Sequence, residues 1–288
     1  MPEKPRYINA GGKLIDLETP KVMGILNITP DSFYKGSRYN SNEEILRTAI
    51  RMMEDGADMI DVGGYSSRPG ASDISEEEEG SRVIKAIRLI MREMPKAVIS
   101  VDTFRADIAR EAVTGCGAQM INDISGGEGD KRMFSLIEEL NVPYIMMHMK
   151  GDPRSMQVHP VYDDVVADIL KWFGDRIFRL KSAGVKDIII DPGFGFGKTV
   201  EHNFDLLRRL GDFSIAGLPV LIGVSRKSMI WKTLGITADE ALNGTTVLNA
   251  VALCNGADIL RVHDVKEAVQ TVRLLNNIMK SKTGSADR

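Results

Sequence analysis

The sequence predicts an α/β protein built as a (β/α)₈ TIM barrel, and three observations support this fold class. A phrase of glycine, a short apolar run and a polar residue recurs at 56–61, 117–122, 184–191 and 256–261. Apolar, strand-like runs alternate with amphipathic stretches, a pattern typical of a parallel sheet. Filling the gaps between the repeated phrases gives eight strand–helix units, and eight is the number that closes this barrel.

The recurring phrase accounts for four of the strands, and the gaps between its copies account for the others. Its glycine ends the preceding helix in the left-handed conformation, and the apolar run that follows is typical of a strand buried on both faces. The polar residue at its end then presents a functional group. The strands are expected at 22–27, 58–62, 97–102, 119–122, 143–147, 187–191, 219–223 and 258–262.

Apolar residues at helical spacing predict the helices between these strands. We interpret the stripes as helix faces that pack on the barrel rather than as a cofactor site. They are Ile45, Ala49, Met52 and Met53; Val83, Ile84, Ile87, Ile90 and Met91; and Val165, Ile169, Trp172, Phe173 and Ile177. The acidic run 76–79 is expected to begin a helix, where negative charge suits the helix dipole. We expect that run to be solvated and to have no role in a site.

The segment 6–18 does not fit a strand–helix unit. It resembles a β-hairpin that turns at Gly11 and Gly12, and we expect it to plug the N-terminal, bottom face of the barrel. No linker divides the chain, so a single domain is expected over 1–288, with a core at about 20–280. The residues 281–288 are expected to form a flexible tail.

Composition excludes several classes of protein. With 37 basic and 40 acidic side chains, the formal net charge is −3, which argues against nonspecific nucleic-acid binding. No apolar run approaches the roughly 20 residues of a membrane span, and the first residues lack the apolar core of a secretory signal. The two cysteines, Cys116 and Cys254, form neither a disulfide framework nor a zinc motif. A cytoplasmic location is therefore expected, without nucleic-acid or membrane partners.

Polar side chains stand at or just past all eight expected strand ends, where a closed barrel places its active site. They are Asn27, Asp61, Asp102, Asn122, His148, Asp191, Lys227, Arg261 and His263. Any single one could be a helix cap or an ion-pair partner, but capping alone explains eight ends poorly. Of these, Asp102, Asn122 and Asp191 offer acceptors that suit a flat heterocycle with an amino group, a ring N–H and a carbonyl. The cationic groups suit a diphosphate or a carboxylate.

Glycine-rich segments follow three of the strands. The segment 191–199 is not a phosphate-binding Walker loop, because Pro192 stands where that motif needs glycine; we interpret it as a tight loop that offers Phe196 as an apolar wall. The segments 27–40 and 61–70 are long enough to form a cover over a substrate. Whether His148 lines the site or packs at the rim is left open.

Nine short strings, taken together and in order, resemble the motifs of the dihydropteroate synthase family. The match runs from about residue 20 to about residue 275. The strings are GILNITPDSF at 24–33, DVGG at 61–64, SRPG at 67–70, SVDT at 100–103, INDI at 121–124, MHMKG at 147–151, DPGFGFGK at 191–198, SRKS at 225–228 and RVHD at 261–264.

The resemblance implies an enzyme that joins 6-hydroxymethyl-7,8-dihydropterin diphosphate to p-aminobenzoate in folate biosynthesis. It implies catalytic roles for Asp102, Lys227, Arg261 and His263. The pterin would be bound by Asp102, Asn122, Met147, Asp191, Gly223, Lys227 and Arg261. The diphosphate would be bound by Asn27, Ser67, Arg68, Arg261 and His263. The p-aminobenzoate pocket would be formed by Phe33, Ser67, Arg68, Pro69, Phe196, Lys227 and Ser228.

The resemblance further implies a homodimer, inhibition by sulfonamides and a Mg²⁺ ion near Asn27. Two positions depart from the family pattern, which usually has Glu at position 65 and Thr at position 67. Here Tyr65 and Ser67 stand there. Ser67 keeps the hydroxyl but lacks the methyl group, so the p-aminobenzoate pocket is expected to be slightly roomier.

Two other functions stay open from the sequence alone. A methyltransferase that acts between methyltetrahydrofolate and a corrinoid protein shares the barrel and would explain the pterin acceptors. It would explain Arg68, Lys227 and the anion-binding pair Arg261 and His263 less well. A non-catalytic pterin-binding protein would bind without turnover. Release of pyrophosphate from pterin diphosphate and p-aminobenzoate distinguishes a synthase from both.

Overall fold

The computed structural model describes residues 4–28, 41–66, 73–151, 156 and 160–283. Within them, eight parallel strands form one sheet in the order β8-β7-β6-β5-β4-β3-β10-β9. A bridge between Ile190 and Val220 joins the two ends of this order and nearly closes the barrel. The strands are β3 (Lys21–Asn27), β4 (Met59–Gly63), β5 (Ile99–Asp102), β6 (Met120–Asp123), β7 (Tyr144–Met147), β8 (Ile188–Asp191), β9 (Leu221–Ile222) and β10 (Ile259–Val262).

Five of the eight strands lie within the predicted ranges, whereas β3, β4 and β6 each extend one residue beyond them, and β9 is shorter than expected. The backbone N–H of Val220 donates to the Asp258 side chain at 2.7 Å, so the residue before β9 contributes only the isolated bridge. The fold class predicted from the sequence is confirmed.

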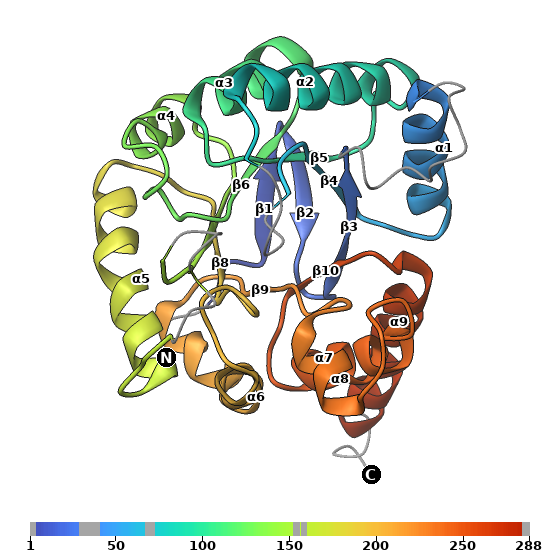
Figure 1. Ribbon diagram of the computed structural model, residues 1–288, viewed down its shortest axis with the longest axis vertical. Helices are drawn as coiled ribbons and strands as arrows, with labels where there is room; N and C mark the ends of the chain where they lie inside the picture. Colours follow the sequence, from blue (N-terminus) through green and yellow to red (C-terminus); the bar gives the residue numbers. More distant parts are fainter. Residues whose placement is uncertain (1–3, 29–40, 67–72, 152–155, 157–159, 284–288) are drawn as a thin grey trace.

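Helices surround the sheet as an outer ring (Figure 1). They are α1 (Ser41–Glu54), α2 (Glu76–Glu93), α3 (Ala106–Cys116), α4 (Met133–Leu140), α5 (Val165–Ser182), α6 (Val200–Arg208), α7 (Ser228–Leu234), α8 (Leu242–Cys254) and α9 (Val265–Thr283), with a 3₁₀ helix at Leu210–Ala216. The stripes predicted from helical spacing pack inward: Ala49, Val83, Ile87, Ile169 and Phe173 are buried. Helix α9 continues to Thr283, so it includes the first three residues of the predicted tail, 281–283. In the described residues, no helix has the length and apolarity to cross a membrane.

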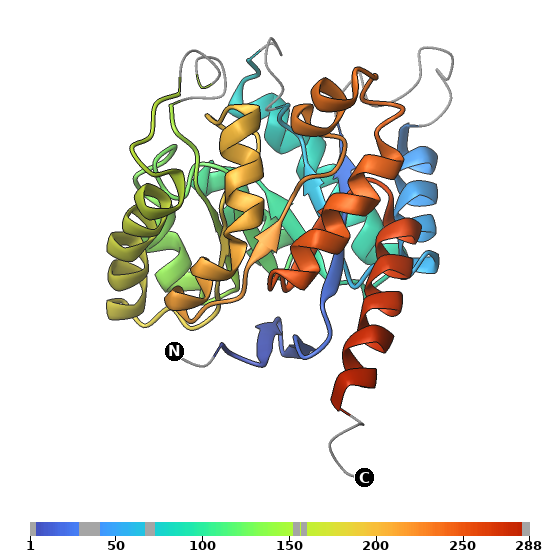
Figure 2. The ribbon, with the colours of Figure 1, turned by 90° about the horizontal axis from the view of Figure 1, so that it is seen from below.

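The N-terminal hairpin consists of β1 (Tyr7–Ala10) and β2 (Lys13–Asp16), which pair in antiparallel register. It lies across one end of the barrel (Figure 2). Ile8, Ala10, Ile15 and Leu17 form a buried cluster with residues at the beginning of the barrel strands. The predicted plug of the N-terminal face is therefore confirmed, and the opposite end is left for a site.

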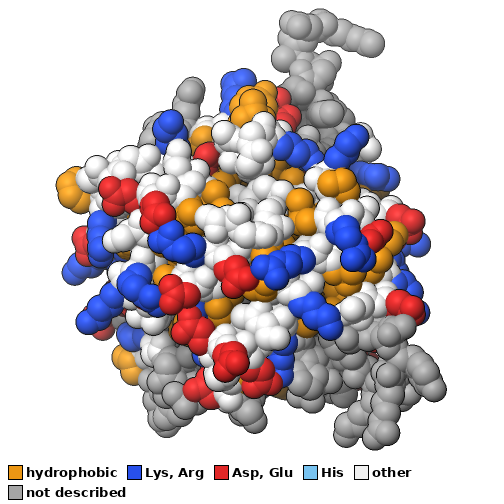
Figure 3. All heavy atoms as spheres, turned by 90° about the horizontal axis from the view of Figure 1, so that it is seen from above, with side chains coloured by type: hydrophobic (Ala, Val, Ile, Leu, Met, Phe, Trp, Pro, Cys, Tyr) orange, Lys and Arg blue, Asp and Glu red, His pale blue; other side chains and the backbone are white. Residues whose placement is uncertain are grey.

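Charge is mixed on the outer wall. Seen from the top of Figure 1, basic and acidic side chains are interspersed, and no field of one sign dominates that face (Figure 3). The described side chains on this face form no extended basic surface, and their mixture agrees with the formal net charge of −3.

Candidate active site at the C-terminal end of the barrel

Arg261 of β10 lies at the centre of the candidate site, between two carboxylates. Its Nε donates to Asp61 Oδ2 at 2.6 Å, and its Nη2 donates to Asp102 Oδ2 at 2.5 Å. Asn122 Nδ2 donates to the same Asp61 oxygen at 2.8 Å. The C-terminal ends of β4, β5, β6 and β10 thus bring four polar side chains into one hydrogen-bonded cluster.

Asp61 is the member of this cluster to which the sequence assigned no role. Its side chain is fully buried, and one oxygen accepts from both Arg261 and Asn122. Its other oxygen, Oδ1, has no hydrogen-bond partner among the described residues. The sequence held one indication that Asp61 belongs to the site. Asp61 ends a copy of the repeated phrase, as Asn122 does, and so stands at the end of a predicted buried strand.

The carboxyl group of Asp102 has an unusual acidity. Burial raises the pKa of Asp102 to about 7; the Arg261 charge opposes this, while Asp61, Glu79 and Asp123 add to it. A carboxyl group with a pKa close to the ambient pH can hold or release a proton there. Asp102 is therefore suited to a ligand ring that exchanges a proton or donates an N–H.

A second charged pair lies at the ends of β8 and β9. Asp191 is buried, and its Oδ1 accepts from the Gly193 N–H at 2.7 Å. Lys227 directly precedes α7, and its ammonium donates to the Phe194 carbonyl. Burial lowers the pKa of Lys227 to about 8, with Asp191 opposing the shift. Burial also raises the pKa of Asp191, with Lys227 opposing.

An apolar wall adjoins these charges. Two residues predicted for different ligands, Met147 and Phe196, belong to one small cluster with Ile124, Met149 and Met156. The Lys227 ammonium lies 4.5 Å from the centroid of the Phe196 ring, a cation–π distance. The site therefore combines a flat apolar surface with acceptors and cations, as a heteroaromatic ligand requires.

Of the residues predicted to bind the diphosphate, the structure describes Asn27, Arg261 and His263. The backbone N–H of His263 donates to Ser225 Oγ at 3.2 Å, and the same oxygen lies 3.0 Å from His263 Nδ1. His263 itself is exposed, so it can meet a ligand. Ser225 was part of a quoted motif but had no assigned role. Asn27 ends β3 opposite Gly63.

Two further predicted residues, Gly223 and Ser228, lie near these groups in the chain. Gly223 lies beside Arg261, because a Cβ at 223 would be 4.0 Å from the Arg261 Cβ. Ser228 is the first residue of α7. The remaining predicted residues, Phe33, Ser67, Arg68 and Pro69, lie outside the described residues.

Comparisons with known proteins agree with this geometry. Residues 23–263 match the family described as pterin binding enzyme. Over 275 residues the chain is 42% identical to the dihydropteroate synthase of Escherichia coli K12, covering 95% of this chain and 96% of that protein. It is 41% identical over 264 residues to that of Bacillus subtilis 168, covering 91% and 90%. The chain belongs to the dihydropteroate synthase family.

Solved structures of this family share the fold. The dihydropteroate synthase of Yersinia pestis, solved with a sulfonamide drug complex, superimposes with a TM-score of 0.89 at 38% identity, covering 95% of this chain and 99% of that one. The Xanthomonas albilineans enzyme with 4-aminobenzoic acid gives a TM-score of 0.89 at 37% identity, covering 95% and 98%. The same enzyme in complex with 7,8-dihydropteroate gives 0.86 at 35%, with the same coverage.

Glu79 corrects one expectation from the sequence. Helix α2 begins at Glu76 as predicted, but the acidic run is not solvated throughout. Glu79 is fully buried, accepts a 2.6 Å hydrogen bond from Thr103 Oγ1 and lies 3.2 Å from Arg105 Nη1. Burial raises the pKa of Glu79, with Thr103 and Arg105 opposing. A signal was available, because Glu79 stands one helical turn before Val83 on the buried stripe of α2.

Arg105 connects this ion pair to the position where the chain departs from the family. Its guanidinium lies 5.9 Å from the ring centroid of Tyr65 and 5.3 Å from that of Phe104. The two rings meet edge to face at 5.2 Å. Arg105 Nη2 also donates to the Ile74 carbonyl at 2.8 Å. Tyr65 therefore packs in a cluster with Phe104 and Arg105, which follow β5 in the chain.

His148 proves to be a packed residue. Its ring meets that of Trp172 edge to face at 5.0 Å, and burial lowers its pKa to about 2, so it is neutral. It borders a groove of about 450 Å³ that Tyr162 and Trp172 also line. Of the residues predicted for substrate that the structure describes, none lines this groove.

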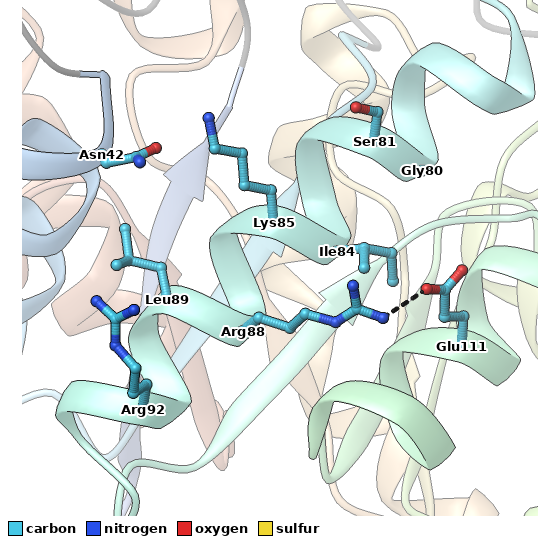
Figure 4. Close-up of a pocket in the computed structure, with 9 residues that line it drawn as sticks. All are labelled: Asn42, Gly80, Ser81, Ile84, Lys85, Arg88, Leu89, Arg92 and Glu111. Carbon is cyan, nitrogen blue, oxygen red and sulfur yellow. Dashed lines mark hydrogen bonds and ion pairs between the residues drawn. The ribbon is translucent and has the colours of Figure 1, made fainter.

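A groove of about 620 Å³ lies on the outer wall, along α2 and away from the barrel mouth. Lys85, Leu89 and Arg92 point toward the α1 side, whereas Arg88 turns toward Glu111 of α3 (Figure 4). Arg88 Nη2 donates to Glu111 at 2.9 Å. These charged groups are exposed, and we assign the groove no part in the site.

Proposed function

We propose that this chain condenses 6-hydroxymethyl-7,8-dihydropterin diphosphate with p-aminobenzoate, giving 7,8-dihydropteroate and diphosphate. One observation carries the proposal: Arg261 is held between Asp61 and Asp102 at the end of the barrel that the hairpin leaves open. A planar cation fixed beside buried acceptors suits a flat, polar, hydrogen-bonding heterocycle. Structural neighbours with 4-aminobenzoic acid and with 7,8-dihydropteroate support the same pair of substrates.

We assign the pterin to the buried part of the site. Asp102, Asn122 and Asp191 supply acceptors for its amino group and ring N–H, and Asn122 also supplies donors. The Arg261 guanidinium offers a flat cationic face for stacking on the ring. Met147 supplies an apolar contact, and Gly223 leaves space beside Arg261.

We assign p-aminobenzoate to the Phe196 side of the site. Phe196 offers a ring face, and Lys227 and Ser228 offer donors to a carboxylate or a nearby oxygen. Sulfonamides share the aromatic amine and the polar end of p-aminobenzoate, so we expect them to compete there. The sulfonamide complex of the Yersinia pestis relative supports this expectation.

We assign the diphosphate to the rim. His263 and Arg261 supply donors or positive charge, and Asn27 supplies an amide oxygen. A Mg²⁺ ion commonly takes only one or two protein oxygens together with substrate phosphate oxygens and water. Asn27 fits such a sparse donor set, and in the described residues no cluster of three or more acidic, His or Cys side chains offers a fuller one. When bound, the ion would neutralise charge on the leaving diphosphate.

The reaction needs orientation more than a protein nucleophile. The amine of p-aminobenzoate attacks the pterin methylene, the C–O bond breaks, and the diphosphate leaves with the bonding pair. The amine then loses a proton. Arg261 and His263 stabilise the charge that develops on the leaving oxygen, while Asp102 and Asp191 hold the pterin and face the positive charge that develops on its methylene. Packing around Phe196 and Met147 excludes water and aligns the two substrates.

We further propose that the chain forms a homodimer through α8 and α9. Val247 and Val251 on α8, and Leu274 and Ile278 on α9, are exposed by 52, 38, 67 and 54%. Helix α8 is apolar on its outer side as well as its inner side, as expected of a helix covered by a partner. We also propose a cytoplasmic location, because the two cysteines are free thiols rather than a disulfide.

A pyrophosphate-release assay with purified chain tests the activity. Both substrates together should release pyrophosphate, and omission of p-aminobenzoate or of Mg²⁺ should reduce the rate to background. Release of pyrophosphate without p-aminobenzoate would indicate hydrolysis instead of condensation. Tight pterin binding with no release would indicate a binding protein.

A further inference from the structure

The loop 192–199 between β8 and α6 is pressed against the chain that follows β7. Gly193 has φ +72°, and a Cβ there would lie 1.9 Å from the His148 carbonyl oxygen. Gly197 has φ +63°, and a Cβ there would lie 2.4 Å from the Lys150 carbonyl oxygen. Only glycine allows this approach at both positions. The loop carries Phe196, so its path decides where the apolar wall of the site lies.

Lys198 is buried behind this loop, with 2% of its surface exposed. Its ammonium donates to the carbonyl oxygens of Gly193 and Phe196, each at 2.9 Å. A third short contact, of 3.0 Å, reaches His148 Nδ1. An ammonium group has three N–H donors, and these three contacts are its shortest; a longer one of 3.4 Å reaches the His148 carbonyl oxygen. Lys198 therefore points into the backbone of the loop and not toward the site.

His148 is suited to accept this third hydrogen bond. Because its ring is neutral, Nδ1 can carry a lone pair while Nε2 carries the proton. Its ring is held against Trp172, which fixes the direction of that lone pair. The strand-end histidine thus completes the set of acceptors around Lys198.

The other face of the loop meets the site lysine. The Lys227 ammonium donates to the Phe194 carbonyl and lies 4.5 Å from the Phe196 ring centroid. Asn203 Oδ1 accepts the Gly195 N–H at 2.7 Å. The loop is therefore held between two ammonium groups, one buried behind it and one in the site.

We infer that Lys198 is a positioning residue, which acts through the loop to place Phe196 for p-aminobenzoate. The inference rests on the proposed function for the identity of that substrate. Loss of the Lys198 donors would leave the part-buried Phe196 carbonyl without its Lys198 hydrogen bond and the Gly193 carbonyl with only the bond from the Phe196 N–H, and would free the loop to move. Pterin, held mainly by Asp102, Asn122 and Asp191, would be affected less.

The test is a double-mutant cycle of Lys198→Met and Phe196→Ala, with Lys186→Met at an exposed lysine as the matched control. Lys198→Met should raise the KM for p-aminobenzoate about tenfold and change the dissociation constant of the pterin less than about threefold. In the Phe196→Ala background, Lys198→Met should raise the KM for p-aminobenzoate by less than about a further twofold. If the two effects multiply instead, Lys198 does not act through Phe196 and the inference is overturned.

Amide hydrogen exchange tests the same positioning without turnover. Lys198→Met should speed exchange at Gly195 and Phe196 and leave β8 protected; unchanged exchange in the loop would overturn the inference.

Should Lys198→Met fail to fold, a second pair of variants at His148 tests the same inference. His148→Leu removes the third acceptor, whereas His148→Asn keeps an acceptor near the position of Nδ1. Only the former should raise the KM, and equal KM values would overturn the inference. A wild-type chain that releases no pyrophosphate contradicts the proposed function, whereas the exchange result still decides the role of Lys198.

Discussion

Arg261 and Asp61 belong to strands separated by β3 in the barrel, and their side chains form a hydrogen-bonded ion pair of 2.6 Å. Asp61 is fully buried, and 20% of the Arg261 side chain is exposed. Arg261 thus has one face held by the protein and another available to a ligand. We expect Asp61 to act on a substrate through its two hydrogen-bond partners, Arg261 and Asn122.

Asp61→Ala should destabilise the protein and weaken pterin binding. Removing one partner of a buried pair leaves the other charge uncompensated, at a cost of about 3 kcal/mol in the free energy of unfolding. Urea unfolding measures this loss, and calorimetric titration measures pterin affinity. Asp163→Ala, at an exposed aspartate, is the control. Unchanged pterin affinity would show that Arg261 needs no anchor.

Asp191→Ala should abolish detectable pterin binding. The substitution removes a buried acceptor and leaves Lys227 without the carboxylate that opposes the lowering of its pKa. Calorimetric titration with the pterin is the measurement, and circular dichroism checks that the fold is retained. Near-normal affinity in a folded variant would refute the assignment of Asp191.

The pH dependence of kcat/KM should have a maximum between about 7 and 8. Asp102 must be ionised to accept from the pterin, and burial raises its pKa to about 7, so activity should rise as pH increases through that value. Lys227 must be protonated, and burial lowers its pKa to about 8, so activity should fall above it. A profile of kcat/KM reports groups of the free enzyme. In Asp102→Asn the residual activity should lose the acidic limb; retention of that limb would assign it to another group.

Glu79→Gln should shift the acidic limb of this profile to lower pH. The Glu79 charge raises the pKa of Asp102, and glutamine removes that charge while keeping an acceptor for Thr103. Glu77→Gln, at an exposed residue of the same helix turn, should leave the profile unchanged. An unshifted limb in Glu79→Gln would show that Glu79 does not influence Asp102.

Val251→Glu should convert the proposed dimer to monomers. A charge placed in an apolar interface must be desolvated without a partner, which opposes association. Light scattering coupled to size-exclusion chromatography measures the mass. Phe178→Glu, at an exposed residue of α5, serves as the control. A wild-type mass of one chain would refute the dimer.

The sequence predicted much of the fold because the relevant signals are local. Glycine followed by an apolar run marks where a helix ends and a buried strand begins, and all eight strands appear where this phrase and its gaps placed them. The hairpin at Gly11 and Gly12 also depends on neighbouring residues only. Strand-end polar residues could be assigned to one rim because every parallel strand of a barrel ends on the same side.

What the sequence by itself determined is therefore the barrel, its plug and the residues that stand at its rim. The tertiary structure alone decided how the charges pair: Asp61 with Arg261, Glu79 with Arg105, and Lys198 with the backbone of its own loop. Residues 61 and 261 are distant along the chain, and Glu79 meets Arg105 and Thr103 only because α2 packs on the barrel. Burial and partner choice depend on long-range contacts, and these set the desolvation and Coulomb terms that govern each charge.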